Sequence, residues 1–328
     1  MRVLSSLVLV LRDIWTLSFL RDILCEFLGT SVFLFSSLAS VLLWPSEQIW
    51  EPPGLPDGLY NGLSTDLSAG LSTGLLTGLS TSLSAGVSPD FSPAVPPDSA
   101  SRPHLQCPAP GLRVALAFGT SVGLVGLCLG PASSVGGVHL NPAVTLALAA
   151  GLRISPWRAT LYVGGQLLGA VCSCCVLLAL LPPHLRDTLA LNQVSEGVRP
   201  YQAVLVEMAV TFQLVLCVLA TARPKSAFHL PGPLLVGLSV TLGHLVAISY
   251  TGCGMNPARS FGPALVTLNF TNHWVYWAGP CVGAWLASLL HDLLLHPRWS
   301  CPGDWWAEFK ELFPKDHQKQ PTTLENAA

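Results

Sequence analysis

The chain has 328 residues, of which 51% are hydrophobic and only 10% are charged, and its formal net charge is −2. A soluble domain carries about 25% charged residues, so this composition argues against an ordinary soluble domain and indicates a protein whose solvent is a lipid bilayer. The small net charge gives no electrostatic basis for a nucleic-acid partner.

Most of the ten cysteines lie inside apolar runs, where they behave as small buried hydrophobes, so we expect no disulfide framework. We expect a free thiol at Cys107.

The N-terminal segment 1–15 is expected to lie in the cytoplasm and to lead into a first membrane span at 16–45. The first ten residues are apolar after Arg2, but no small-residue cleavage site follows and charged residues come soon after. We therefore do not expect a cleaved signal peptide. Because three charged residues lie near the start of the span, its membrane-embedded part is expected to begin near Ile23.

The segment 46–110 is expected to be an expanded extracellular loop, since its acidic residues outnumber its basic ones. A Leu recurs at every fourth position from Leu55 to Leu83, and Gly precedes most of these residues. A period of four would suit a stripe on a helix, but each Gly costs about 1 kcal/mol relative to Ala in a helix. We therefore favour a disordered, repeat-expanded insert over 54–91 to which no chemistry is assigned.

Six apolar runs are long enough to cross about 30 Å of hydrocarbon. Basic residues gather before the first span, between the fourth and fifth, and after the sixth, which places both termini in the cytoplasm. The channel core is expected to occupy 111–296, and 297–328 to form a cytoplasmic tail. The runs are 17–44, 111–131, 156–181, 200–222, 232–250 and 273–296.

The tripeptide Asn-Pro-Ala occurs twice, at 141–143 and 256–258, each time in an apolar background. The runs that begin there, 141–151 and 256–267, are too short to span a bilayer. Asn followed by Pro is typical of a helix start, with Asn as the N-cap and Pro at the first helical position. We predict two half-helices that dip into the membrane, which requires that they line a cavity or lie buried in protein.

The two halves of the chain also resemble each other outside these boxes. Residues 26–30 and 207–211 both begin with Glu and end with Thr, and 166–170 corresponds to 280–284. Three spans per half is an odd number, so the halves must have opposite orientation in the membrane. The prediction is an all-α membrane protein with six transmembrane helices and two re-entrant half-helices in an inverted 3+3 repeat.

This arrangement resembles the aquaporin family. The run Thr-Gly-Cys-Gly-Met-Asn-Pro-Ala-Arg-Ser-Phe-Gly at 251–262 is a specific signature of that family, and Gly-His-Leu at 243–245 extends it. The resemblance covers the chain except for 46–110 and about the last thirty residues. It implies the aquaporin fold, passive conduction of water, a homotetramer with one pore per subunit, and a multi-pass location in the plasma membrane.

By this resemblance, Asn141 and Asn256 donate amide N–H groups to water in the middle of the pore. Water held in this way is turned from its neighbours, so a proton cannot pass along the file. The two facing half-helix N-termini, each with about half a positive charge, repel cations there. An ordinary N-cap is the alternative for each Asn alone, and the duplication favours the pore.

The resemblance also implies an outer constriction formed by Phe118, His244, Arg259 and the backbone around Cys253. An ionisable residue at membrane depth indicates a functional site, which favours Arg259. A lone His or Phe in an apolar span is more often a core residue, and Phe118 lies about three residues farther from the first box than the family pattern has it. Cys253 beside the constriction predicts block by mercurials.

The same resemblance implies that backbone carbonyls lead water to each Asn, and that two buried carboxylates brace the re-entrant loops. One of the carbonyl residues, Val138, stands where the family has a smaller side chain. The carbonyls belong to Gly137, Val138, His139, Gly252, Cys253 and Gly254, and the carboxylates to Glu26 and Glu207.

Water is favoured over glycerol as the permeant. In glycerol-conducting members an Asp usually follows Arg259 and the filter His is replaced, whereas this chain has Ser260 and retains His244. Passage of other small neutral solutes such as glycerol is an alternative.

Two functions of other classes remain as alternatives. One is an alternating-access transporter, which would need more charged residues for ion coupling, and the other is a non-conducting junctional protein with the same fold. With no metal cluster or nucleophile–base pair, we expect no enzyme, metal or cofactor.

Two further signals lie near the ends of the spans. Asn269-Phe270-Thr271 is a possible glycosylation sequon in an outward-facing position. In the tail, 304–313 places three apolar side chains on one helical face, which suits a short interfacial helix as well as a disordered tail.

Overall fold

The computed structural model describes residues 16–42, 110–134, 137–182, 186, 189–222 and 231–312. The predictions for 1–15, for the repeat insert with Cys107 and for the tail after 312 lie outside these residues. The nine cysteines within them are free.

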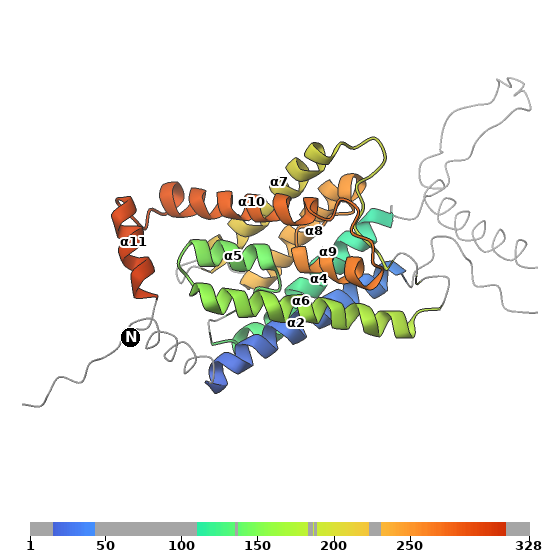
Figure 1. Ribbon diagram of the computed structural model, residues 1–328, viewed down its shortest axis with the longest axis horizontal. Helices are drawn as coiled ribbons and strands as arrows, with labels where there is room; N and C mark the ends of the chain where they lie inside the picture. Colours follow the sequence, from blue (N-terminus) through green and yellow to red (C-terminus); the bar gives the residue numbers. More distant parts are fainter. Residues whose placement is uncertain are drawn as a thin grey trace, which may run out of the picture. The chain divides into compact units, whose positions relative to one another are not determined.

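Throughout the described ranges the regular structure is helical, and six of the helices are long and apolar enough to cross a membrane (Figure 1). Two shorter helices, α5 (Pro142–Ala150) and α9 (Pro257–Val266), begin at the duplicated boxes. The predicted fold class is therefore confirmed. The six long helices are α2 (Leu17–Leu42), α4 (Pro110–Leu129), α6 (Pro156–Leu180), α7 (Pro200–Thr221), α8 (Gly232–Thr251) and α10 (Val275–Leu289).

Three short elements complete the helical structure. A 3-10 turn (Gly130–Ala132) extends α4, and a π-helical turn (Leu290–Leu295) extends α10. The helix α11 (Pro302–Glu311) follows, with the rings of Trp305 and Phe309 stacked at 5.2 Å between centroids. The apolar helical face expected in the tail is thus present.

Proline begins most of these helices. It stands in the first turn of α5, α6, α7, α8, α9 and α11, where its missing N–H has no intrahelical partner to lose and its fixed φ suits the helix. The sequence therefore sets the helix starts locally, before any packing.

Glycines let the long helices approach in pairs that follow the inverted repeat. A Cβ at Gly169 on α6 would lie 2.4 Å from the Phe27 carbonyl of α2, and one at Gly283 on α10 would lie 2.2 Å from the Met208 carbonyl of α7. These are equivalent pairs in the two halves. Between α4 and α8, a Cβ at Gly119 would lie 2.5 Å from the carbonyl of Gly237. Such small residues allow close backbone contact between membrane helices.

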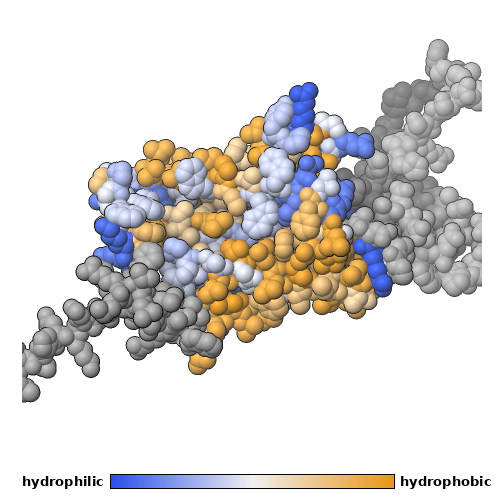
Figure 2. All heavy atoms as spheres, viewed as in Figure 1, coloured by the Kyte–Doolittle hydropathy of each residue, from blue (hydrophilic) through white to orange (hydrophobic). Residues whose placement is uncertain are grey.

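Apolar side chains cover the outer side of the bundle. On α2 the exposed residues include Leu20, Leu24 and Leu28, spaced to lie on one face, while the opposite face carries the buried Asp22 and Glu26. Figure 2 shows hydrophobic residues over much of this side of the molecule. A helix with an apolar outer face and a polar inner face suits lipid outside and a functional interior.

Candidate functional site

Each of the two short helices begins at an Asn that caps it. Asn141 and Asn256 both have extended backbone, and their Oδ1 atoms accept from the backbone N–H of Ala143 and Ala258, both at 2.9 Å. Both caps are almost fully buried. This is the ordinary N-cap bond, made twice in equivalent places.

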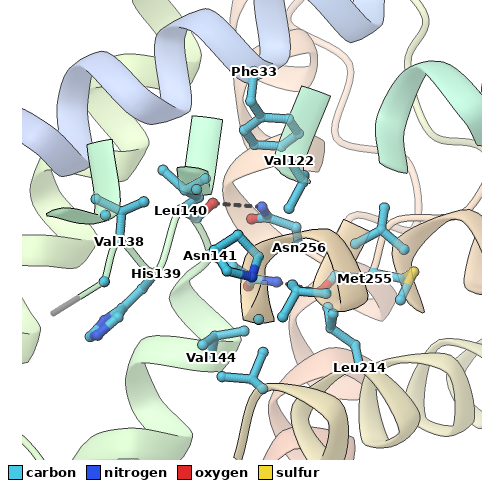
Figure 3. A pocket seen from close by; sticks show the side chains of 18 of the residues that line it. Phe33, Val122, Val138, His139, Leu140, Asn141, Val144, Leu214, Met255 and Asn256 are labelled. Carbon is cyan, nitrogen blue, oxygen red and sulfur yellow. Dashed lines mark hydrogen bonds between the residues drawn. The ribbon is translucent and has the colours of Figure 1, made fainter. Parts of the chain in front are cut away.

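The remaining part of each Asn amide reaches across to the other box. Asn141 Nδ2 donates to the carbonyl of Met255 at 2.9 Å, and Asn256 Nδ2 donates to the carbonyl of Leu140 at 2.7 Å. Figure 3 shows the second of these bonds, with the two Asn side chains close to each other. The two half-helices are therefore joined N-terminus to N-terminus by a reciprocal pair of hydrogen bonds.

The residue before each Asn has a left-handed backbone. Leu140 has φ 58° and Met255 has φ 53°, and Cys253 in the second loop has φ 57°. Such a conformation costs about 1–2 kcal/mol for a residue with a side chain, and it persists only where the surroundings impose it. Here it aims the Leu140 and Met255 carbonyls at the opposite Asn.

Two buried carboxylates hold these strained loops in place. Glu26 accepts from the N–H groups of His139 at 2.6 Å and Leu140 at 2.8 Å, and Glu207 accepts from those of Gly254 and Met255, both at 2.7 Å. In each half the bonded residues are the two directly before the Asn. Side-chain donors complete each carboxylate: Gln166 Nε2 at 2.8 Å from Glu26, and Thr251 Oγ1 at 2.6 Å from Glu207.

Phe118, His244 and Arg259 form a single cluster. The Phe118 and His244 rings stack at 4.4 Å between centroids, and the Arg259 guanidinium lies 4.9 Å from the centre of the Phe118 ring. All three side chains are almost fully buried. His244 Nδ1 lies 2.9 Å from the carbonyl of Val240, while its Nε2 and the Nε of Arg259 have no protein partner. Both of these atoms are themselves buried.

One cavity of about 420 Å³ contains this cluster and both Asn residues. It is also lined by Gly130, which lies about 18 Å farther along the axis of α4 than Phe118. The cavity therefore extends from the cluster, past the paired boxes, to the opposite end of α4. Its walls are largely apolar, and polar groups are concentrated at the boxes and at the cluster.

The structure separates the residues expected in the pore wall into two groups. Those on the cavity are Gly137, Val138, His139, Gly254, both Asn residues and the three-residue cluster. Gly252 and Cys253 are not among the lining residues, and the Cys253 side chain has no exposed surface. Phe118, whose assignment relied on resemblance alone, lies in direct contact with His244 and Arg259.

The sequence did not predict that the segment 189–192, which lies outside the two Asn-Pro-Ala boxes, forms hydrogen bonds with Arg259 and its neighbour Ser260. Arg259 Nη1 donates to the carbonyl of Ala190 at 3.0 Å, and Ser260 Oγ donates to Asn192 Oδ1 at 2.9 Å. Leu189 and Ala190 both have positive φ. Nothing in the residue types of this connection predicts the contact, because a backbone carbonyl is available at every residue.

Among the described residues, no three His, Cys, Asp or Glu side chains are grouped so that they could hold a metal ion.

Asn269, the first residue of the possible glycosylation sequon, lies in the connection from α9 to α10 and is half-buried. Its Oδ1 accepts from the Thr271 N–H at 3.1 Å.

The sequence pattern of the family described as Major intrinsic protein matches residues 13–291. The chain belongs to the major intrinsic protein family. Its members are channels and not enzymes, so this protein is a membrane channel.

Two relatives of this family illustrate the similarity. The chain is 38% identical over 288 residues to aquaporin-5 of Sus scrofa, an alignment that covers 87% of this chain and 85% of that protein. It is 47% identical over 218 residues to the lens fiber major intrinsic protein of Ovis aries, which covers 65% of this chain and 82% of that protein.

A solved structure shares the fold. The X-ray structure of the aquaglyceroporin from Plasmodium falciparum matches with a TM-score of 0.60, covering 85% of this chain and 98% of that chain. The sequence identity is 20%, so this likeness concerns the fold alone.

Proposed function

We propose that this channel conducts water in single file down osmotic gradients and excludes protons and ions. The observation that carries the proposal is the buried cluster of Phe118, His244 and Arg259 on the same cavity as both capped Asn residues. Two aromatic rings narrow the passage, and the guanidinium supplies donors while it repels cations. His244 and Arg259 both line the cavity, and both side chains can donate hydrogen bonds to water.

Charge exclusion has a second source at the boxes. The N-termini of α5 and α9 face each other there, and each carries about half a positive charge. A cation that has lost its hydration shell meets this field in the middle of the membrane, where charge is costly. Each Asn amide uses one N–H across the boxes and has a second for a passing water oxygen.

Water is preferred over glycerol because of the residues around Arg259. Bulky His244 stacks on Phe118, and Ser260 rather than an acidic residue follows Arg259. Glycerol conduction is the alternative.

We further propose a homotetramer in the plasma membrane, with segments 1–15 and 297–328 in the cytoplasm and 46–110 outside. The grouping of basic residues at one set of span ends supports this orientation. In that orientation Asn269 lies outside and is a candidate glycosylation site.

Stopped-flow light scattering of proteoliposomes, in sucrose and then in glycerol gradients, tests the proposal. The wild type should pass water well above empty vesicles and pass little glycerol. His244→Ala and Arg259→Val should admit glycerol, because each removes bulk or donors from the constriction. Leu265→Ala on the exposed side of α9 serves as a matched control that leaves both fluxes unchanged. Wild-type water permeability equal to that of empty vesicles would refute the proposal.

A further inference from the structure

Asp22 is a buried carboxylate that does not line the cavity and has no direct part in the proposed conduction of water. It lies one turn before Glu26 on α2 and is 1% exposed. Its Oδ1 accepts from the backbone N–H of Ser134 at 2.7 Å, and its Oδ2 accepts from the Ser134 hydroxyl. Arg158 Nη1 on α6 lies 3.9 Å from Oδ2. A buried carboxylate is costly unless its oxygens are bonded, and here the first re-entrant loop supplies two of the bonds.

The inverted repeat has no counterpart of this carboxylate. The residue four positions before Glu207, which corresponds to Asp22 before Glu26, is the fully buried Ala203. The loops that the carboxylates serve also differ in length. Positions 130–141, which include the 3-10 turn, separate α4 from α5, whereas only positions 252–256 separate α8 from α9. The additional carboxylate, Asp22, is thus found in the first half, where the connection between the long helix and the half-helix is more than twice as long as in the second half.

Ser134 lies in the middle of the residues that this long loop contributes to the pore. Gly130 and Pro131 line the cavity before it, and Gly137 and Val138 line the cavity after it. Glu26 fixes only the far end of the loop, through the two residues before Asn141. The bonds from Asp22 fix a point between the two groups of lining residues.

We propose that Asp22 is a positioning residue of the pore: through Ser134 it holds the first re-entrant loop back, so that the end of the cavity opposite the filter stays open. The inference rests on the proposed water function. Without this tether the two Ser134 donors turn to water, and the loop samples positions that obstruct the passage. Asp22 does not touch the permeant; it acts through the loop.

The test is water permeability per folded channel in proteoliposomes, with its activation energy, for Asp22→Ala, Asp22→Asn and Ser134→Ala. Asp22→Ala should lower permeability several-fold and raise the activation energy. Asp22→Asn keeps one acceptor for the Ser134 N–H, so its loss should be smaller. Because both residues act through one contact, Ser134→Ala added to Asp22→Ala should cause little further loss.

Ser31→Ala is the matched control, because Ser31 links α2 to the Gly169 carbonyl of α6 without touching the loop or lining the cavity. It should conduct as the wild type. If the role of Asp22 were purely structural, Asp22→Ala would lower the yield and the unfolding temperature. The permeability per folded channel and its activation energy would then stay unchanged. If Asp22→Ala does not fold, Asp22→Asn and Ser134→Ala carry the same comparison.

Two results would overturn the inference. If the wild type conducts water and Asp22→Ala has the same permeability and activation energy, the inference about Asp22 is wrong while the proposed function stands. The same holds if both Asp22→Asn and Ser134→Ala have wild-type values. A wild type that passes no more water than empty vesicles would overturn the proposed function and this inference together.

Discussion

Asn141 and Asn256 each donate a side-chain N–H to the carbonyl group that directly precedes the other. The distances are 2.9 Å to Met255 and 2.7 Å to Leu140. Each side chain also caps its own half-helix through its oxygen, so both ends of each amide are engaged. The boxes are therefore one mutually bonded unit whose geometry depends on both halves of the chain.

Asn256→Asp separates the two tasks of this side chain. Asp caps a helix as well as Asn does, but an ionised carboxylate cannot donate to the Leu140 carbonyl. We expect the variant to conduct less water and to lose more than about 1 kcal/mol of unfolding free energy, because the crossing bond is lost and the new charge is buried. The new negative charge should also admit cations at the boxes.

Stopped-flow water flux and proton flux into vesicles measure these effects together. Asn272→Asp, in the connection before α10 and away from the cavity, controls for the added charge and should behave as the wild type. Wild-type water and proton fluxes in Asn256→Asp would show that the crossing bond has no part in conduction.

Because Glu26 and Glu207 make equivalent contacts, we expect their substitution by Gln to lower the unfolding free energy by similar amounts. Glu26→Gln and Glu207→Gln each keep one acceptor oxygen, so one of the two bonded loop N–H groups loses its partner. An unsatisfied buried donor costs about 1–3 kcal/mol, and the equivalent contacts imply similar costs at both sites. Thermal unfolding of the detergent-solubilised protein gives the comparison.

Glu308→Gln is the surface control for this pair. Glu308 bonds Arg298 at a partly exposed site, so its loss should change the unfolding free energy by less than about 1 kcal/mol. A loss in the two brace variants no larger than that of Glu308→Gln would contradict the bracing role.

The sequence predicts most of this architecture because its signals are local. Span length, Asn-Pro helix starts and an odd number of spans per half lead to the inverted repeat without any tertiary information. Glu26 and Glu207 could be placed only by resemblance. The crossing Asn bonds, the Ala190 carbonyl at Arg259 and the Asp22–Ser134 tether could not be predicted, since their partners are backbone groups or common residues distant in the chain.

Mercurial block at Cys253 remains a prediction with a sharper form. The side chain is fully buried in the second re-entrant loop and does not line the cavity. We therefore expect block of water flux by a mercurial to develop slowly, as the loop opens, and to disappear in Cys253→Ser. Cys301→Ser, at an exposed cysteine beside α11, should keep the block. Full block in Cys253→Ser would assign the sensitivity to another thiol.

His273, in the connection between α9 and α10, predicts a pH dependence of stability. Trp277 Nε1 donates to His273 Nε2 at 3.0 Å, which requires a neutral imidazole. Partial burial lowers the pKa of His273 below its ordinary 6.5. The rings around it, Phe261, Phe270 and Tyr276, carry no charge that would offset this effect.

A lowered pKa in the folded state means that the unfolded chain binds a proton first as the pH falls. The contribution of His273 is therefore fully present above pH 6.5 and is lost as the pH falls through the lower folded pKa. Unfolding temperature measured from pH 7.5 downward should decline for the wild type. In His273→Gln, whose neutral amide can still accept from Trp277, the decline should be shallower. Parallel pH profiles for the two proteins would contradict this role, because the titrating group would then lie elsewhere.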